Sequence, residues 1–247
     1  MKFIFRLLFL FTASLVAQSR ISDYNQIGWY STFINTKLAK SYSLHGEYQW
    51  RRTHLLENGQ QGLFRTSLGY WLKPQAQLRL GFAWAETYPY GIPINSYGKR
   101  FTEYRIFQMV SLFDSIGKTH LQHRFMLEQR WLGKYTSPNF SQEDSYSYVN
   151  RVRYLFRAQI PIYKKMYLAI YDEVFIGFGD NIGDNIFDQN RAGCLVGFTV
   201  WQNGRMELGY LNQILQLSRT VDGKNVFQHN NGITLSIIAN LDLTARL

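Results

Sequence analysis

The sequence predicts an all-β fold: a single antiparallel, up-and-down transmembrane β-barrel of about 10–12 strands, with short periplasmic turns and longer extracellular loops. Three observations predict this fold. An export signal begins the chain, segments of alternating hydrophobicity follow one another, and short connections alternate with long ones. One alternating segment alone would equally suit a half-buried strand of a soluble sandwich, so the prediction depends on the recurrence of the pattern.

The N-terminal segment, MKFIFRLLFLFTASLVAQ, has the composition of a secretory signal peptide. Lys2 and Arg6 precede the apolar run 7–16, and Ala17 supplies the small residue of a cleavage site. We therefore predict a signal peptide over residues 1–17 and an outer-membrane barrel domain over residues 18–247. The alternative, an N-terminal membrane anchor, is disfavoured because the apolar run is short. No cysteine follows the predicted cleavage site, which argues against a lipoprotein.

The composition fits a barrel with a polar lining. The chain is 46% hydrophobic and 17% aromatic, yet its mean hydropathy is −0.25. After the first twenty residues, no apolar run reaches the length of a membrane helix. Half of each barrel strand faces inward, which lowers the average hydropathy of the chain. The single Cys194 excludes an intramolecular disulfide and a thiol-rich metal site, and it falls on an apolar strand face.

The clearest strand follows the 73–76 turn and runs over residues 77–86, about the length that a tilted strand needs to cross a bilayer. Successive side chains of a strand point to opposite faces. Leu78, Leu80, Phe82 and Trp84 therefore form one apolar face. The opposite face is polar or small, and it comprises Gln77, Arg79, Gly81, Ala83 and Ala85.

The same pattern recurs from one end of the chain to the other. The first candidate, 25–34, is amphipathic but irregular, and the later ones alternate more regularly. The predicted strands are 25–34, 42–53, 64–72, 77–86, 101–110, 120–131, 148–158, 166–178, 188–200, 205–217 and 228–241. The predicted short turns are 35–40, 73–76, 114–117, 160–164 and 202–204, where Asn203-Gly204 is a hairpin signal. The predicted longer loops are 54–62, 88–100, 133–145, 179–186 and 220–225.

The strand count raises a difficulty. Eleven candidates are present, whereas bacterial single-chain barrels close with an even number. Placing the long loops outside also makes the first candidate run towards the periplasm, although an exported chain would start there. Two explanations stay open: a twelfth strand near the N-terminus, or a first candidate that is not a barrel strand.

The charges are expected to line the interior. The formal charge is +10, and removal of Lys2 and Arg6 leaves 25 basic and 17 acidic residues, or +8. A basic, aromatic-rich chain also suits nucleic-acid binding, but the arginines are dispersed at a period of two rather than clustered. Arg or Lys facing hydrocarbon at the bilayer midplane costs roughly 2–4 kcal/mol. The predicted inward-facing charges are Glu47, Arg51, Arg65, Arg79, Glu103, Arg105, Arg124, Glu128, Arg130, Arg151, Arg153, Glu173, Arg191 and Glu207.

These side chains allow two functional interpretations. They form a hydrogen-bonded network that simply fills the barrel, or they line a narrow pore that the arginine excess biases towards anions. We expect a monomer in the cell outer membrane, with outer-membrane lipid as its partner, no nucleic acid, and a small anionic solute as the candidate cargo. Whether the lumen is open or plugged does not follow from the sequence.

Several segments carry a resemblance to a known family. They are HRFMLEQRW (123–131), RVRYLFRAQIPI (151–162), YDEVFIGFG (171–179), FDQNRAG (187–193) and ELGYLNQ (207–213), together with the early tryptophan region. Across essentially the whole mature chain, the sequence resembles an uncharacterised outer-membrane β-barrel family of Gram-negative bacteria with a domain of unknown function. The resemblance implies an outer-membrane barrel, and it implies no activity or catalytic residues.

Two other classes of function remain open. A lipid-modifying barrel enzyme, an acyl hydrolase or acyltransferase, needs a nucleophile beside a base. No local sequence around the five histidines provides this pair, and His120 and His123 point to opposite faces. A structural barrel could instead bind partners through its extracellular loops.

No metal or cofactor site is predicted. The segment 180–185, DNIGDN, lacks the spacing and the closing Glu of an EF-hand, and we interpret it as a solvated turn. Five tryptophans near strand ends are expected to form the membrane-interface girdle: Trp50, Trp71, Trp84, Trp131 and Trp201.

Overall fold

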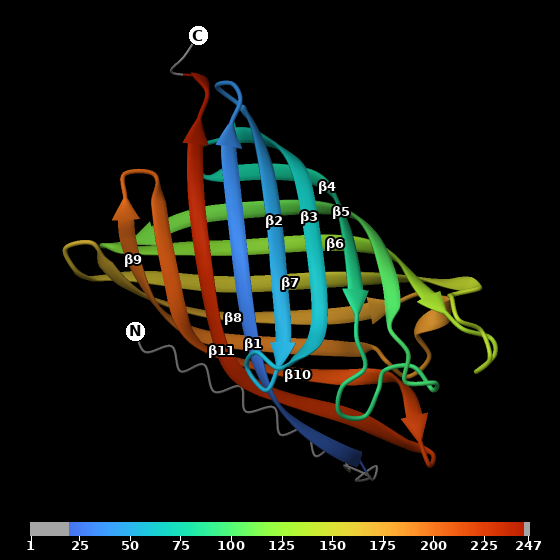
Figure 1. Ribbon diagram of the computed structural model, residues 1–247. Helices are drawn as coiled ribbons and strands as arrows, with labels where there is room; N and C mark the ends of the chain where they lie inside the picture. The colour runs from blue at the N-terminus through green and yellow to red at the C-terminus, as the bar shows by residue number, and fades with distance from the viewer. Residues whose placement is uncertain (1–19, 245–247) are drawn as a thin grey trace, which may run out of the picture.

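The computed structural model describes residues 20–244 as one closed β-barrel (Figure 1). The predicted signal peptide lies outside the described residues. The strands are β1 (Arg20–Lys37), β2 (Tyr42–Thr53), β3 (Asn58–Lys73), β4 (Ala76–Thr87), β5 (Phe101–Ile116), β6 (Thr119–Lys134), β7 (Ser145–Tyr163), β8 (Met166–Phe178), β9 (Phe187–Trp201), β10 (Gly204–Val221) and β11 (Lys224–Asp242). A 3₁₀ turn, η1 (Asp180–Ile182), lies between β8 and β9. No helix within residues 20–244 is long and apolar enough to span a membrane.

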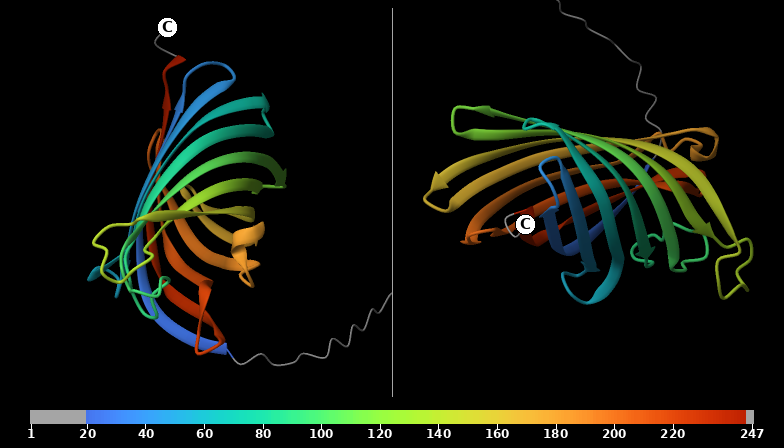
Figure 2. Two further views of the ribbon diagram at one scale, coloured as in Figure 1. Left: turned by 90° about the vertical axis from the view of Figure 1, so that its right-hand side faces the viewer. Right: turned by 90° about the horizontal axis from the view of Figure 1, so that it is seen from above.

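The all-β barrel prediction is confirmed, and its strand count falls inside the predicted range. Each strand pairs antiparallel with the next along the chain, from β1–β2 to β10–β11. Figure 2 shows the tilted strands wrapping into a continuous wall.

The barrel closes through a parallel seam between β1 and β11, where Arg20 pairs with Asn225 and Lys37 with Asp242. With an odd number of strands, the first and last must run in the same direction. Neither explanation offered for the odd count applies to the described residues: the irregular first candidate is itself a barrel strand, and it closes the barrel directly. The prediction of a wholly antiparallel sheet is wrong at this one seam.

The two ends of the barrel differ in their connections. Short turns at 38–41, 74–75, 117–118, 164–165 and 202–203 lie at one end with the end of β11, and we call this the turn end (Figure 1). The connections 54–57, 88–100, 135–144, 179–186 and 222–223 lie at the loop end, where β1 begins. The predicted strict alternation of short and long connections is wrong at 54–57 and 222–223. Strand pairing continues through polar residues near both sites and leaves only tight connections.

The barrel presents mainly apolar side chains outward, and its buried charged side chains point inward. On β4, Leu80 is 60% exposed on the outer surface, whereas its inward neighbour Ala83 is fully buried. Trp50 and Trp201 are exposed on the outside, as expected of girdle residues. Trp71 departs from that expectation, since it lines the interior near the turn end and packs against Phe113 with ring centroids 5.6 Å apart. Its place in the alternation of β3 puts it on the same face as Arg65.

Candidate functional site: a divided lumen

The interior of the barrel contains two cavities. The large cavity, about 1010 Å³, extends from the middle of the barrel to Lys40, Lys73 and Pro74 at the turn end. The small cavity, about 190 Å³, lies towards the loop end and is lined there by Tyr90 and Ile94 of the 88–100 loop. The lumen is therefore a pair of chambers rather than one uniform channel.

The fourteen charged residues selected from the sequence all lie on the inner side of the wall. The large cavity is lined by Glu47, Arg51, Arg65, Arg79, Arg124, Arg153, Glu173, Arg191 and Glu207. The small cavity is lined by Arg51, Glu103, Arg105, Arg130, Arg151 and Arg191. Glu128 is fully buried between arginines of both groups. Arg51 and Arg191 border both cavities.

A continuous network of ion pairs crosses the middle of one wall, and we call it the septum. Its members are Glu103, Arg105, Glu128, Arg130, Arg151, Arg153, Glu173 and Asp188. Glu128 lies at its centre. One Glu128 oxygen accepts a 2.7 Å hydrogen bond from Arg151 Nε, and the other accepts a 2.9 Å bond from Arg153 Nη1. Such charge-assisted bonds are stronger than neutral ones, and here they satisfy charges that are removed from water.

The septum continues to both sides of Glu128. Towards the loop end, Asp188 Oδ2 accepts a 2.7 Å bond from Arg151, and Glu103 pairs with Arg105 at 2.7 Å. Towards the turn end, Arg153 pairs with Glu173 at 2.7 Å. Each arginine in the septum has at least one carboxylate partner, including Arg105 and Arg130, which are paired across β5 and β6 and share Glu103.

A stack of rings and guanidinium groups lies between the two cavities. The guanidinium carbon of Arg51 lies 3.9 Å from the centroid of the Trp29 ring, and that of Arg191 lies 4.9 Å from the same ring. Arg191 also lies 4.6 Å from the Phe175 ring, which Arg153 approaches to 4.4 Å on the septum side. Cation–π contacts of this kind are strongest where water is excluded. The stack joins β2 to β7 across the interior, and its members Arg51 and Arg191 line both cavities.

The 88–100 loop covers the small cavity at the loop end. Asp23 Oδ2 accepts a 2.7 Å bond from the Ile92 amide, and Gln228 Nε2 donates to the Ile92 carbonyl at 2.9 Å. The Tyr90 hydroxyl accepts bonds from Gln60 at 3.0 Å and from Asn230 at 3.1 Å. Burial raises the pKa of the Tyr90 phenol, so it stays protonated. The loop begins after β4 and is thereby tied to β1, β3 and β11.

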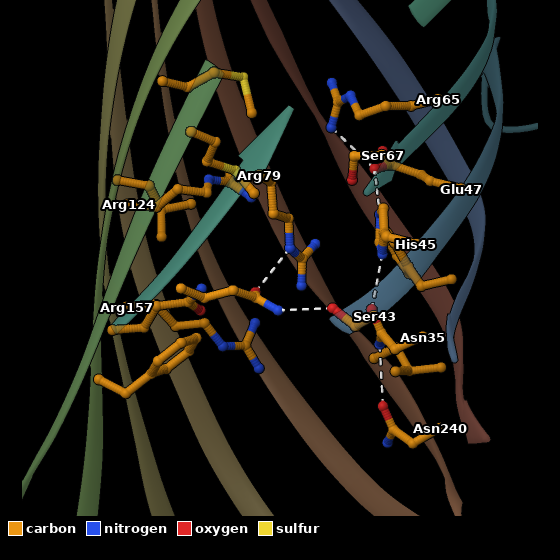
Figure 3. A pocket seen from close by; sticks show the side chains of 18 of the residues that line it. Asn35, Ser43, His45, Glu47, Arg65, Ser67, Arg79, Arg124, Arg157 and Asn240 are labelled. Carbon is orange, nitrogen blue, oxygen red and sulfur yellow. Dashed lines mark hydrogen bonds and ion pairs between the residues drawn. The ribbon is translucent and has the colours of Figure 1, made fainter. Parts of the chain in front are cut away.

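A second polar chain lines the large cavity opposite Arg79, Arg124 and Arg157 (Figure 3). His45 Nδ1 lies 2.7 Å from Asn35 Oδ1, and His45 Nε2 lies 3.4 Å from Glu47 Oε2. Glu47 also pairs with Arg65 at 2.9 Å. Both ring nitrogens of His45 therefore have polar partners, neither of them a hydroxyl.

Comparison with known proteins places the chain in a family. The family model described as "Protein of unknown function (DUF2490)" matches residues 26–224, which is most of the chain. The chain belongs to the DUF2490 family. No curated protein matches it. A solved structure of the NanC porin in a rhombohedral crystal form is similar to this chain at 13% identity and a TM-score of 0.46, covering 81% of this chain and 91% of the porin chain.

Sequence reasoning missed several residues that build the lumen of this DUF2490 protein. Asp188 and its neighbour Gln189 both face inward. The reason is a register shift between β8 and β9 opposite Phe175 and Ile176, which leaves Asp188 as an extra residue in β9. A similar irregularity between β2 and β3 turns Gln60 inward, where it accepts a 2.6 Å bond from Trp29 Nε1. Strict alternation cannot locate a bulged residue, since a bulge sets two residues against one.

The inward-facing aromatics of the DUF2490 barrel were also missed, although glycines gave a signal for them. A Cβ at Gly81 would lie 2.3 Å from the Phe107 ring, and one at Gly193 would lie 2.3 Å from the Tyr171 ring. The inner glycines therefore leave the space that these rings occupy. An aromatic residue on the inner face opposite a glycine is a pattern that could have been read from the sequence.

Among the described residues, no His/Cys/Asp/Glu group of three could hold a metal ion. One serine–histidine pair does form in this DUF2490 protein: Ser115 Oγ lies 3.2 Å from His120 Nδ1 at the exposed end of the β5–β6 hairpin. Within residues 20–244, His120 has no hydrogen-bonded carboxylate to orient it. The third group of a nucleophile–base–acid arrangement is therefore missing at this pair.

Proposed function

We propose that this protein is an outer-membrane barrel that conducts small anions through a constriction at Arg51, Trp29 and Arg191. The outward apolar faces and strands of twelve or more residues support a place in a bilayer. The inward placement of the charged side chains gives the lumen a polar lining. The septum and the ring stack limit the pathway to small solutes.

The observation that carries the anion preference is the lack of acidic partners at the constriction. Arg51 donates to the side-chain oxygens of Gln49 and Gln61, and Arg191 donates to Gln189. Neither arginine forms an ion pair with a carboxylate among the described residues, whereas the arginines of the septum do. Two positive charges without a paired carboxylate at the proposed constriction attract anions and repel cations.

The proposal is tested by single-channel recording in planar bilayers under a KCl gradient. The wild-type barrel should give a small conductance. The sign of its reversal potential should show that chloride is more permeant than potassium. The double substitution Arg51→Gln and Arg191→Gln should lower the chloride-to-potassium permeability ratio severalfold, because it removes both unpaired charges and keeps hydrogen-bonding side chains.

Lys118→Gln is the matched control, because it removes one positive charge at an exposed turn away from both cavities. Its selectivity should equal that of the wild type. A wild-type barrel without ion flow over a wide range of salt, or an equal selectivity in the double variant, would refute the proposal.

A further inference from the structure

The wall of the large cavity combines apolar and cationic side chains in adjacent register positions. Across β4, β5, β6 and β7, one row reads Arg79, Met109, Met126 and Arg153, because each residue pairs with the next. The adjacent row places Arg124 beside Leu155. An aliphatic patch of Met109, Met126 and Leu155 therefore lies between guanidinium groups.

Arg79 is the cation of this wall that has only a neutral partner. Its Nε donates a 2.8 Å bond to Gln77 Oε1, and no carboxylate pairs with it within residues 20–244. Arg124 pairs with Glu173 through Nη2 at 2.8 Å, while its buried Nε has no hydrogen-bond partner. Figure 3 shows the side chains of Arg79, Arg124 and Arg157 on one side of the cavity. Among the described residues, Arg79 thus has no carboxylate partner and Arg124 Nε has no acceptor, and both side chains lie beside the apolar patch.

Unsatisfied polar atoms occur on β3 as well, the strand that pairs with β4 beside Arg79. Ser67 Oγ and Arg65 Nε both belong to buried side chains of the large cavity and have no partner. Buried polar groups without partners are costly, and a bound ligand or ordered water is the usual way to satisfy them. Among the described residues, four of the six such atoms belong to side chains that line this cavity, and the other two, Gln228 Oε1 and Asn230 Oδ1, lie at the loop end.

We propose that the large cavity binds an amphiphilic organic anion, with its acidic head group at Arg79 and Arg124 and its apolar body along Met109, Met126 and Leu155. The volume of about 1010 Å³ is at the upper end of the range for small-molecule sites. Lys40 and Lys73 at the turn-end mouth add positive charge along the entry path. The inference deepens the proposed function, since it names the class of solute that enters the same lumen.

Binding is measured by isothermal titration calorimetry on the full chain in phosphatidylcholine nanodiscs, with empty nanodiscs as the blank. Decanoate should bind at least tenfold more tightly than butanoate, which lacks the apolar body, and than decanamide, which lacks the charge. Lysophosphatidate is a membrane lipid that has the same two features, an acidic head group and an apolar chain. Tighter binding of decanoate would identify a free carboxylate as the ligand, and tighter binding of lysophosphatidate would identify a lipid.

Arg79→Gln should weaken the binding of either anion at least tenfold, and Arg79→Lys should restore part of it. Arg124→Gln is a second, independent variant should Arg79→Gln fail to fold, and Lys118→Gln should bind like the wild type. Equal binding of decanoate and decanamide, or no loss of binding in the Arg79 and Arg124 variants, would overturn the inference. Anion binding without ion conduction would refute the proposed pore and support this binding site. Ion conduction without anion binding would support the pore and refute the binding site.

Discussion

Replacing Glu128 by alanine should lower the free energy of unfolding by about 3–5 kcal/mol, because it leaves buried arginines without their shared carboxylate. Glu128 is fully buried and holds Arg151 and Arg153 at 2.6 and 2.9 Å. The isosteric Glu128→Gln should also be strongly destabilising, since it keeps the volume and removes the charge. Denaturant unfolding in lipid vesicles, followed by tryptophan fluorescence, measures both changes.

Glu57→Ala is the matched control, because the Glu57 side chain is 71% exposed in the 54–57 connection and its partner His54 is 3.9 Å away. Exposed pairs of this kind contribute little to stability, so the control should unfold like the wild type. If Glu128→Ala unfolded at the same denaturant concentration as Glu57→Ala, the septum would not be the structural centre of the lumen.

Replacing Trp29 by alanine should increase the single-channel conductance severalfold. The indole contacts Arg51 and Arg191, which line both cavities, so its removal should widen the passage between them. The same change should destabilise the barrel by about 3–5 kcal/mol, as truncation of a buried aromatic does. Conductance in planar bilayers, together with the size of the largest polyethylene glycol that enters the pore, measures the widening.

Trp50→Ala is the control for Trp29→Ala. Trp50 is on the neighbouring strand, is 42% exposed and faces outward. Its loss should leave the conductance unchanged. An unchanged conductance in Trp29→Ala as well would place the constriction elsewhere in the barrel.

The outer surface of the barrel could be predicted from the sequence because it follows a local rule. The alternation of Leu78, Leu80 and Phe82 with polar or small residues needs only the period of a strand, and the structure retains it. The bounds of β2 (Tyr42–Thr53) and β8 (Met166–Phe178) were predicted residue for residue. Other strands were predicted too short, because pairing continues into polar segments such as residues 111–116 of β5.

The seam and the division of the lumen could not be predicted, because both depend on contacts between distant parts of the chain. The parallel pairing of Arg20 with Asn225 joins the two ends of the described barrel, and no local pattern specifies it. Asp188 and Gln60 lie at register shifts, where alternation fails. The contact of Arg191 on Trp29 joins β9 to β1, which come near each other only once the barrel closes.

The most direct test of the central claim is to label single cysteines along one strand in a Cys194→Ser background, with the barrel in nanodiscs. Leu80→Cys and Phe82→Cys are outward positions, and Arg79→Cys lines the large cavity. If the apolar face meets lipid and the charged face encloses a polar lumen, a membrane-impermeant maleimide will label Arg79→Cys and leave the two outward cysteines unlabelled. Labelling of Leu80→Cys and Phe82→Cys at the rate of Arg79→Cys would contradict the membrane-spanning barrel.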